Sequence, residues 1–538
     1  MHAPVRVALV LGSLMVPHWI YKVVLRLYSS GAVSLRAIFL IPPTEPRADK
    51  PSLAFRIHEK LDRFVFRSGW DVDQPMDLQH ALPGMSGRIF PFSTGQTPEG
   101  ELPGELDILL NLSDARLPDW LSGIARLGNW SILVGPFSDS TEILPCYWEM
   151  IRREPGITVS VIGEQPARAE KTVIHRSYIP LHCNSMHINR QHAFGMCEVI
   201  LLRLMEGLHR SGPGYIRMTM EKFRNEKILG NRTTARYSAP SNLVAIKNLA
   251  GIAGGVACRK LFLRSEFRWH LMLDTTGKER PFSTDDFRPL IPPGDRFWAD
   301  PFVVARSDRF FIFIEEFLYQ RKKGHISVLE LDHEGNLLNN SCIIKKPYHM
   351  SYPFVFRVGE SWFMIPETSE NRTIELYQCL EFPYTWKFVM NLAKNTDAAD
   401  TTLFRHNDTW WMFTAVSPRT EFADYRELFV YYSNDLFTDN WLSHPGNPVV
   451  SDIRSARPAG AIFSRDGKIY RPSQDCSGRY GRAVNINEIN ELTKSGYSEC
   501  RVARIRPRWN PELKGLHTFN SAEGIRVTDV YKLYKRFE

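Results

Sequence analysis

The first part of the chain alternates between short, fully hydrophobic runs and amphipathic segments. One apolar, β-branched run ends at Gly12, and a second run ends immediately before two prolines. Strand, glycine turn, helix and strand in this order are typical of the opening of a parallel α/β sheet. We therefore expect a Rossmann-like α/β domain over residues 1–235. Its predicted strands are 5–12, 34–41, 107–112 and 131–134, with helices at 19–28, 118–127 and 192–211.

The second half of the chain repeats. Five segments begin with a polar residue, often next to proline, and continue as a short apolar and aromatic strand. Their equivalent starting points are Asp300, Tyr352, Asp400, Arg457 and His517, separated by 52, 48, 57 and 60 residues. A period of roughly 50 residues with four short strands per unit indicates a β-propeller. We predict an all-β, five-bladed β-propeller over residues 260–538, after a glycine-rich linker at 236–259.

The last of the five repeats is incomplete. Residues 267–273 lie before the first repeat and have the pattern of a strand. We predict that this strand joins the last blade and closes the ring. A β-sandwich of similar strand number is the alternative, but a sandwich does not require matched repeat starts.

Composition narrows the class of protein. The chain has 538 residues, of which 43% are hydrophobic and 23% charged. This excludes a disordered chain, a collagen-like repeat and a small disulfide-stapled protein. The net charge of +8 is mild over this length, and no dense run of Lys and Arg indicates nucleic-acid binding.

The cysteines and the N-terminal segment indicate the cellular compartment in which we expect the protein. Eight cysteines are scattered without a CxxC pair or a Cys/His pair at zinc spacing, which predicts reduced thiols and no metal site. The apolar run at residues 7–16 is too short to span a bilayer. We expect a cytoplasmic protein with no cofactor, no metal and no transmembrane segment. Peripheral contact with a membrane surface stays open, and the oligomeric state is not determined by the sequence.

The repeat starts carry unusual chemistry. In a propeller the innermost strands line a central channel, so the five starts are predicted to converge there, next to Trp298. Buried carboxylates are costly unless they are paired, so a ligand explains this polar ring better than packing does. The alternative is that Asp300 and Asp400 only cap turns through their own backbone.

Longer motifs around these starts resemble known carbohydrate-active propellers. The motifs are residues 298–302, 349–356, 364–370, 399–404, 452–460, 470–476 and 517–520. The segments beginning at 298 and 399 look like the first and third blade motifs of arabinanase/β-xylosidase-type glycosidases. The set as a whole resembles the propeller of plant glucosamine inositolphosphorylceramide transferases and their bacterial relatives.

The glycosidase resemblance implies roles for individual residues. Asp300 would be the general base, and Asp400 would orient the sugar. The position of the family's general acid is Arg457 here, which argues against plain hydrolysis because glycoside cleavage ordinarily needs a protonated carboxyl. Glu367 is the best replacement acid. Alternatively, Arg457 and Arg471 stabilise a phosphate or nucleotide leaving group, and no acid is needed.

Further residues are predicted to bind substrate around the three catalytic candidates Asp300, Asp400 and Glu367. These substrate-binding candidates are Trp298, Tyr352, Arg457, Arg471, Asp475 and His517.

The first half more weakly resembles the N-terminal domain of folate-dependent formyltransferases. Residues 127–136 lie where those enzymes carry Asn-x-His followed by a strand. Asn129 is retained, but Ser131 stands in place of the catalytic histidine, and formyl transfer then lacks its proton shuttle. The resemblance therefore implies a degenerate domain.

These observations predict a glycosyltransferase of cell-surface polysaccharide or glycolipid synthesis, acting on a sugar, sugar-nucleotide or glycolipid substrate. A propeller-type glycoside hydrolase and a non-catalytic sugar-binding propeller are the alternatives. Formyl transfer onto an amino-sugar nucleotide is a third, which would need the missing histidine.

Overall fold

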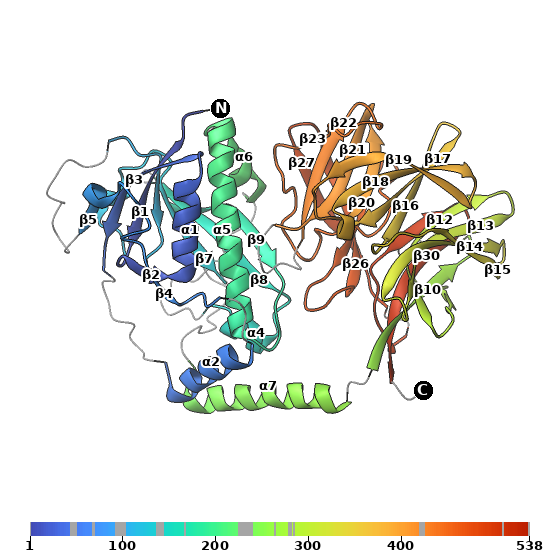
Figure 1. The fold of residues 1–538 in the computed structure, drawn as a ribbon, viewed down its shortest axis with the longest axis horizontal. Coiled ribbons are helices and arrows are strands. Elements are labelled where there is room, and N and C mark those ends of the chain that lie inside the picture. Colours follow the sequence, from blue (N-terminus) through green and yellow to red (C-terminus); the bar gives the residue numbers. More distant parts are fainter. Residues whose placement is uncertain are drawn as a thin grey trace. The chain divides into compact units, whose positions relative to one another are not determined.

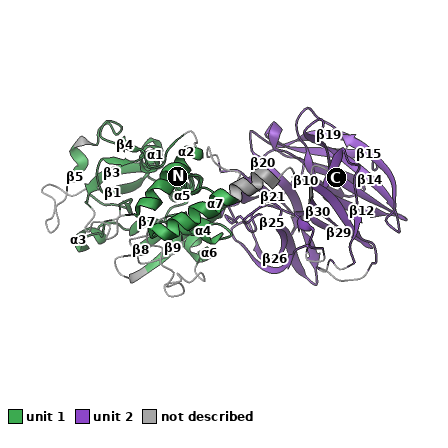
Figure 2. Cartoon of the chain, turned by 90° about the horizontal axis from the view of Figure 1, so that it is seen from below, with its two compact units in different colours: residues 1–256, 420–423 green, residues 257–419, 424–538 purple. Residues whose placement is uncertain are grey.

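The computed structural model contains two compact units, residues 1–256 with 420–423, and the remainder of residues 257–538 (Figure 2). The residues that it describes are 2–42, 51–66, 70–91, 104–113, 115–135, 145–165, 168–223, 240–262, 265–277, 282, 284, 286–418, 426–507 and 510–535. In this described part of the chain, no helix is long and apolar enough to cross a bilayer.

The first unit is built on a seven-stranded sheet in the order β5-β3-β1-β6-β7-β8-β9. The strands are β1 (Val5–Leu11), β3 (Val33–Leu40), β5 (Ile89–Pro91), β6 (Ile108–Asn111), β7 (Asn129–Val134), β8 (Ile157–Gln165) and β9 (Arg168–Ile179). The first five in this order are parallel, and the last two are antiparallel additions. The predicted α/β class is confirmed, and the sheet is mixed.

Helices pack on this sheet or lie beside it in the unit (Figure 1). They are α1 (His18–Ser29), α2 (Leu53–Val65), α3 (Asp119–Ser122), α4 (Tyr147–Arg152), α5 (Met186–Ser211), α6 (Gly214–Phe223) and the first part of α7 (Asn242–Phe262), which continues beyond the boundary at Val256; β2 (Met15–Pro17) pairs with β4 (Pro75–Asp77) beside them. Strand β1 is almost wholly buried, as expected for a central strand between helical layers. The stretch predicted as a linker contains most of α7, because its glycines are spaced among good helix formers.

The second unit is a five-bladed β-propeller, as predicted. Four blades are four-stranded antiparallel sheets of consecutive strands. Blade one holds β12 (Arg296–Arg306), β13 (Arg309–Leu318), β14 (Lys323–Asp332) and β15 (Leu337–Ile344); blade two holds β16 (Ser351–Val358), β17 (Ser361–Thr368), β18 (Thr373–Glu381) and β19 (Thr385–Lys394). Blade three holds β20 (Ala398–His406), β21 (Thr409–Val416), β22 (Glu427–Ser433) and β23 (Leu442–Ser443); blade four holds β24 (Phe463–Arg465), β25 (Lys468–Asp475), β26 (Ala483–Leu492) and β27 (Tyr497–Ile505).

The fifth blade combines the two ends of the propeller sequence. Strand β10 (Ser265–Asp274) pairs antiparallel with β30 (Ile525–Lys535) along its whole length, and β11 (Arg288–Leu290), β28 (Leu513–Gly515) and β29 (Phe519–Ala522) complete the sheet. The predicted closure by residues 267–273 is therefore confirmed. Separate sheets around one centre exclude the β-sandwich alternative.

Apolar side chains fill the space between neighbouring blades. In one cluster, Phe313 of blade one packs with Phe363 of blade two and Met412 of blade three, and none is more than 4% exposed. Such alternating strands bury one face against each neighbouring blade, which explains the aromatic-rich composition. The polar starts are thereby left to face the centre of the ring.

A repeated backbone irregularity turns three of the starts inward. Asp300, Tyr352 and Asp400 have positive φ angles of 51°, 44° and 55°. In each of the three blades the strand register shifts at this point, as in a β-bulge. A positive φ is costly for residues other than glycine and persists only where the surroundings enforce it. The bulges thus direct these side chains into a central space, which we call the funnel.

Candidate active site

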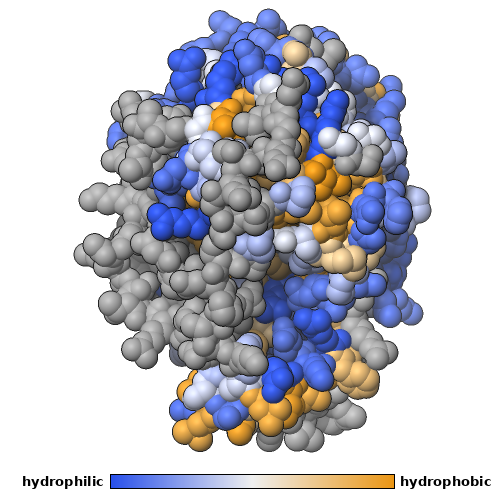
Figure 3. Space-filling view, turned by 90° about the vertical axis from the view of Figure 1, so that its left-hand side faces the viewer, coloured by the Kyte–Doolittle hydropathy of each residue, from blue (hydrophilic) through white to orange (hydrophobic). Residues whose placement is uncertain are grey.

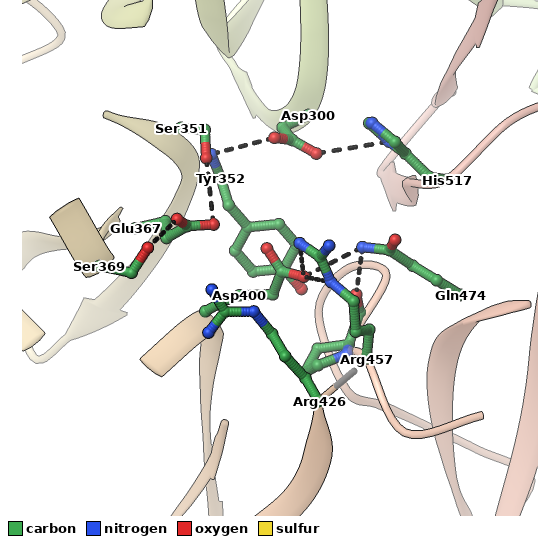
Figure 4. A network of polar contacts seen from close by, with 12 residues as sticks. Asp300, Ser351, Tyr352, Glu367, Ser369, Asp400, Arg426, Arg457, Gln474 and His517 are labelled. Carbon is green, nitrogen blue, oxygen red and sulfur yellow. Dashed lines mark hydrogen bonds and ion pairs between the residues drawn. The ribbon is translucent and has the colours of Figure 1, made fainter. Parts of the chain in front are cut away.

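The first polar cluster of the funnel joins blade one to blade five (Figure 4). Asp300 Oδ1 accepts a hydrogen bond from the Thr518 hydroxyl at 2.8 Å and lies 3.5 Å from His517 Nδ1. His517 Nδ1 lies 2.6 Å from Asp529 Oδ2, and the Asp300 backbone N–H donates to the same oxygen at 2.9 Å. The start of blade one therefore meets two segments of the last repeat, residues 517–518 and Asp529, more than 200 positions away in the sequence.

Burial and neighbouring charges shift the pKa values of Asp300 and Asp529 in opposite directions. Desolvation raises the pKa of Asp300 to about 6, although the nearby His517 opposes this rise. For Asp529, desolvation is outweighed by His517 and by backbone N–H donors, so its pKa is lowered. The pKa of His517 is raised, because the two carboxylates outweigh its desolvation. Asp529 and His517 thus form an ion pair, while Asp300 titrates close to neutrality.

The second cluster centres on Asp400 of blade three. Arg457 Nε donates to Asp400 Oδ2 at 2.7 Å, Arg457 Nη2 forms an ion pair with the same oxygen at 2.7 Å, and Gln474 Nε2 donates to it at 3.0 Å. Within the described part of the chain, Asp400 Oδ1 and Arg457 Nη1 make no hydrogen bond. Desolvation raises the pKa of Asp400 despite the attraction of Arg457. An acceptor and a charged donor are therefore left available side by side.

Two glutamates complete the acidic surface of the funnel. Glu367 is half-buried and accepts hydrogen bonds from the Ser369 hydroxyl at 2.7 Å and the Ser351 hydroxyl at 3.3 Å. Glu315 is 7% exposed and has His349 Nε2 at 3.4 Å. Desolvation, followed by the charges of the neighbouring carboxylates, raises the pKa of Glu315 well above its ordinary value. Burial and the surrounding negative charge therefore favour the protonated form of Glu315.

Aromatic rings border the His517 side of the funnel. The Trp269 indole stacks on the His517 ring at a centroid distance of 4.0 Å. Tyr480, which is 48% exposed, lies edge-on to His517 at 5.2 Å and has the Arg457 guanidinium 5.2 Å from its ring centroid. A half-exposed aromatic beside charged donors and acceptors is typical of a small-molecule binding site.

The Tyr352 side chain is enclosed between blades and is not open to the funnel. Its side chain is fully buried, and its hydroxyl accepts from the Gly460 backbone N–H at 2.8 Å and lies 3.0 Å from Thr402 Oγ1. The hydroxyl thereby links blade two to blades three and four. Desolvation raises its pKa, so it stays a neutral hydrogen-bonding group.

We expect Tyr352→Phe to lower the free energy of unfolding by about 1–3 kcal/mol, because the buried Gly460 N–H loses its acceptor. Urea unfolding measures this, with Tyr470→Phe as the control, since the Tyr470 hydroxyl makes no hydrogen bond with a described residue. A tenfold change in substrate KM with unchanged stability would contradict this role and favour direct substrate binding.

The remaining substrate-binding candidates make contacts outside the two clusters. The Trp298 indole donates to Glu316 Oε1 at 3.0 Å within blade one. Arg471 is 1% exposed and pairs with Glu499, and Asp475 is held by Ser477 and Arg504. These contacts hold the three side chains within their own blades, although the buried Arg471 Nη1 has no hydrogen-bond partner among the described residues.

Sequence reasoning missed several residues of the funnel. Asp529, Thr518 and Gln474 supply contacts to the predicted aspartates. A signal for Asp529 was present, because the second strands of blades one, two and four carry an acidic residue near their ends. Applying that rule to the last repeat leads to Asp529 on β30.

One set of side chains has the composition of a metal site. Among the described residues, Asp300, His517 and Asp529 are the only three potential ligands that lie within 4.8 Å of one another. The 2.6 Å distance between His517 Nδ1 and Asp529 Oδ2 is that of a charge-assisted hydrogen bond. An ion pair between His517 and Asp529 therefore lies at one edge of this cluster.

The α/β unit has a separate cavity of about 770 Å³. It opens beyond the carboxyl ends of β1 and β6, with Ser13 and Ser113 in its wall. The buried Arg190 also lines it and pairs with Glu59 at 2.7 Å. Asn129 lies level with Leu109 inside the sheet and does not line the cavity.

The fold and site together define a five-bladed propeller with paired acidic and basic groups in a central funnel. Residues 292–534 match the family described as Glucosamine inositolphosphorylceramide transferase 1, N-terminal. The resemblance inferred from the propeller motifs is thereby confirmed.

Two curated relatives carry the name glucosamine inositolphosphorylceramide transferase 1. The protein of Oryza sativa subsp. japonica is 34% identical over 209 residues, which are 38% of this chain and 28% of the relative. The Arabidopsis thaliana protein is 30% identical over 211 residues, covering 38% of this chain and 27% of the relative. The similarity thus spans little more than a quarter of each relative.

Two of the solved structures to which this chain is similar are glycoside hydrolases. Zg3597, a family 117 enzyme of Zobellia galactanivorans, has a TM-score of 0.33 at 9% identity and covers 50% of this chain and 90% of its own. A GH32 beta-fructofuranosidase of Bombyx mori has a TM-score of 0.32 at 14% identity, covering 52% of this chain and 60% of its own.

Proposed function

We propose that the propeller is a glycosyltransferase that transfers a sugar from an activated donor to a glycolipid or cell-surface polysaccharide acceptor. The observation that carries this proposal is the unpaired Asp400 Oδ1 beside the unpaired Arg457 Nη1, with Asp300 in the same funnel. The name of the relatives supports the glycolipid class of acceptor.

The reaction assigns one step to each group. An acceptor hydroxyl gives its proton to Asp300 as its oxygen attacks the anomeric carbon of the donor sugar. The bond from that carbon to the donor phosphate breaks, and the electron pair leaves with the phosphate. Arg457 Nη1 stabilises the departing anion, and Asp400 Oδ1 accepts a hydrogen bond from a sugar hydroxyl.

Asp300 is suited to the role of base at neutral pH. A pKa of about 6 keeps most of the side chain ionised at pH 7 and still allows it to bind a proton. Among the described residues, its Oδ2 accepts a single long hydrogen bond, from the Tyr352 backbone N–H at 3.3 Å. A carboxylate oxygen has more than one lone pair, so this oxygen keeps one for the proton.

We expect kcat/KM to rise with pH through about 6, because Asp300 must lose its proton before it accepts one. An aspartate with an ordinary pKa would place this limb near pH 4. A pH–rate profile measures the midpoint. Glu315→Gln is the control, since it keeps the shape of a buried side chain in the same funnel and leaves Asp300 in place to produce the acid limb. A limb near pH 4 in the parent protein would contradict the assignment.

If the propeller instead hydrolyses a glycoside, it needs a protonated carboxyl as general acid. The sequence analysis proposes Glu367 for this role. Glu315 is a second candidate, because burial and neighbouring carboxylates raise its pKa and so favour the protonated form. With water in place of the acceptor, Asp300 as base and either glutamate as acid would cleave a glycoside.

The test is turnover by the purified full chain. A panel of nucleotide-activated sugars, including amino sugars, is supplied with an inositol-phosphate glycolipid acceptor, and products are identified by mass spectrometry. A mass gain of one sugar on the acceptor supports transfer. Release of free sugar from aryl glycosides without transfer supports hydrolysis. Saturable sugar binding with neither reaction identifies a binding module and refutes the enzyme.

For the first unit, we propose a Rossmann-like, degenerate formyltransferase-like domain that binds a small molecule. Its cavity lies where the strand order reverses between β1 and β6, the usual ligand position in open α/β sheets. We place the protein in the cytoplasm, which is supported by the seven free cysteines of the described residues.

A further inference from the structure

Helix α2 of the first unit turns an apolar stripe outward. Leu53, Ile57, Leu61, Phe64 and Val65 are 60%, 46%, 44%, 65% and 66% exposed. Leu53, Ile57, Leu61 and Phe64 follow one another at spacings of four, four and three residues, which places them along one side of the helix, and Val65 lies next to Phe64 at its end. Figure 3 shows hydrophobic side chains gathered at the lower end of this face of the molecule, where Figure 1 places α2.

The start of α7 adds to the same surface. Leu243, Val244 and Ile246 are 79%, 37% and 57% exposed. The Asn242 side-chain oxygen accepts a hydrogen bond from the Ala54 backbone N–H at 2.9 Å, which holds the first turns of the two helices together. We call the eight exposed apolar residues of these helices the α2–α7 face.

Charges on α2 are divided between its two sides. Arg56 and Lys60 are exposed beside the apolar stripe, and Lys247 is exposed on α7. None of these three cations forms an ion pair with a described residue. Exposed lysine and arginine beside an apolar stripe are characteristic of helices that lie in a membrane interface.

The acidic residues of α2 point the other way. Asp62 is 5% exposed and accepts the His187 backbone N–H at 2.8 Å. Glu59 is bound by Arg190 at 2.7 Å and Arg63 at 3.3 Å. The outward side of α2 therefore presents apolar groups and positive charge, and its negative charge is used inside the unit.

We infer that the α2–α7 face docks the protein on an anionic lipid bilayer. A second copy of the same face would bring like cations together, which opposes self-association, whereas anionic headgroups would attract all three. The inference deepens the proposed function, since a glycolipid acceptor resides in a membrane, and it concerns a surface of the first unit alone.

The test is cosedimentation of the full chain with vesicles. We expect binding to phosphatidylcholine vesicles that contain phosphatidylglycerol and little binding to phosphatidylcholine alone. Phe64→Glu is expected to weaken binding by roughly tenfold or more, since a large apolar group no longer enters the interface. Lys60→Gln is expected to weaken binding roughly fivefold on anionic vesicles at low salt.

Leu338→Glu is the matched control, because Leu338 is 53% exposed on β15 of the propeller and should leave vesicle binding unchanged. Equal binding of Phe64→Glu and the parent chain would overturn the inference, as would equal binding to neutral and anionic vesicles. A chain that ignores vesicles but changes from dimer to monomer with Phe64→Glu would identify a self-association surface instead. Vesicle binding without sugar transfer would refute only the proposed function, and transfer without vesicle binding only this inference.

Discussion

Asp300→Asn is expected to lower turnover by about 10²–10⁴-fold, the usual contribution of a general base. The amide cannot take the proton of the acceptor hydroxyl, although it fills the same space. The same change is expected to lower the free energy of unfolding by only about 1 kcal/mol, because Asn keeps one of the two acceptor oxygens that Thr518 and Tyr352 use. Turnover assays and urea unfolding of the same preparation measure both effects.

Asp274→Asn is the control, because it also removes a buried carboxylate from the propeller but at a position outside the funnel clusters. Asp274 is 2% exposed and is paired with Arg526 on the fifth blade, three register positions along β10 from the partner of Asp529. We expect this variant to lose stability and keep its activity. If Asp300→Asn also keeps its activity and loses only stability, Asp300 is a structural carboxylate and the propeller has no base there.

Asp400→Ala is expected to lower the free energy of unfolding by about 3 kcal/mol and to abolish measurable transfer. Its removal leaves the Arg457 guanidinium, whose side chain is 19% exposed, without its carboxylate, and leaves Gln474 Nε2 with the Pro458 carbonyl as its acceptor. Breaking a buried pair costs about 3–5 kcal/mol, and the partial exposure of Arg457 favours the lower value. Urea unfolding of the full chain measures the loss.

The double variant Asp400→Ala with Arg457→Met tests whether the unpaired charge of Arg457 causes the loss of stability. It removes the unpaired charge as well as the carboxylate, so we expect it to be more stable than Asp400→Ala alone. A double variant whose loss equals the sum of the two single losses would show that the two side chains are not coupled. Transfer by either variant would remove Asp400 from the proposed mechanism.

The blade count and the ring closure were predictable because most blades are formed by one continuous segment of the chain. The strands of such a blade pair with their sequence neighbours, so a repeat of about 50 residues contains nearly all the information for one blade. The strand at residues 267–273 could be assigned to the last blade because that repeat lacked a strand and a propeller needs a closed ring.

The site was predictable only at positions that the repeat itself marks. Asp300, Tyr352, Asp400, Arg457 and His517 were identified as equivalent starts, and four of them carry charge into the funnel clusters. Tyr352 fits the same pattern but is satisfied by Gly460 and Thr402, which no pattern in the sequence indicates.

By itself, the sequence determined the α/β class of the first unit, the five blades of the second and the identity of the residues at their starts. These properties follow from hydrophobic periodicity and from repeats, which act over a few residues or one blade. Only the tertiary structure decided which charges meet: Asp529 reaches His517, Arg457 shares Asp400 with Gln474, and Arg471 turns to Glu499. Such pairings, and the pKa of about 6 at Asp300, depend on burial and on distances between segments that are far apart in the chain.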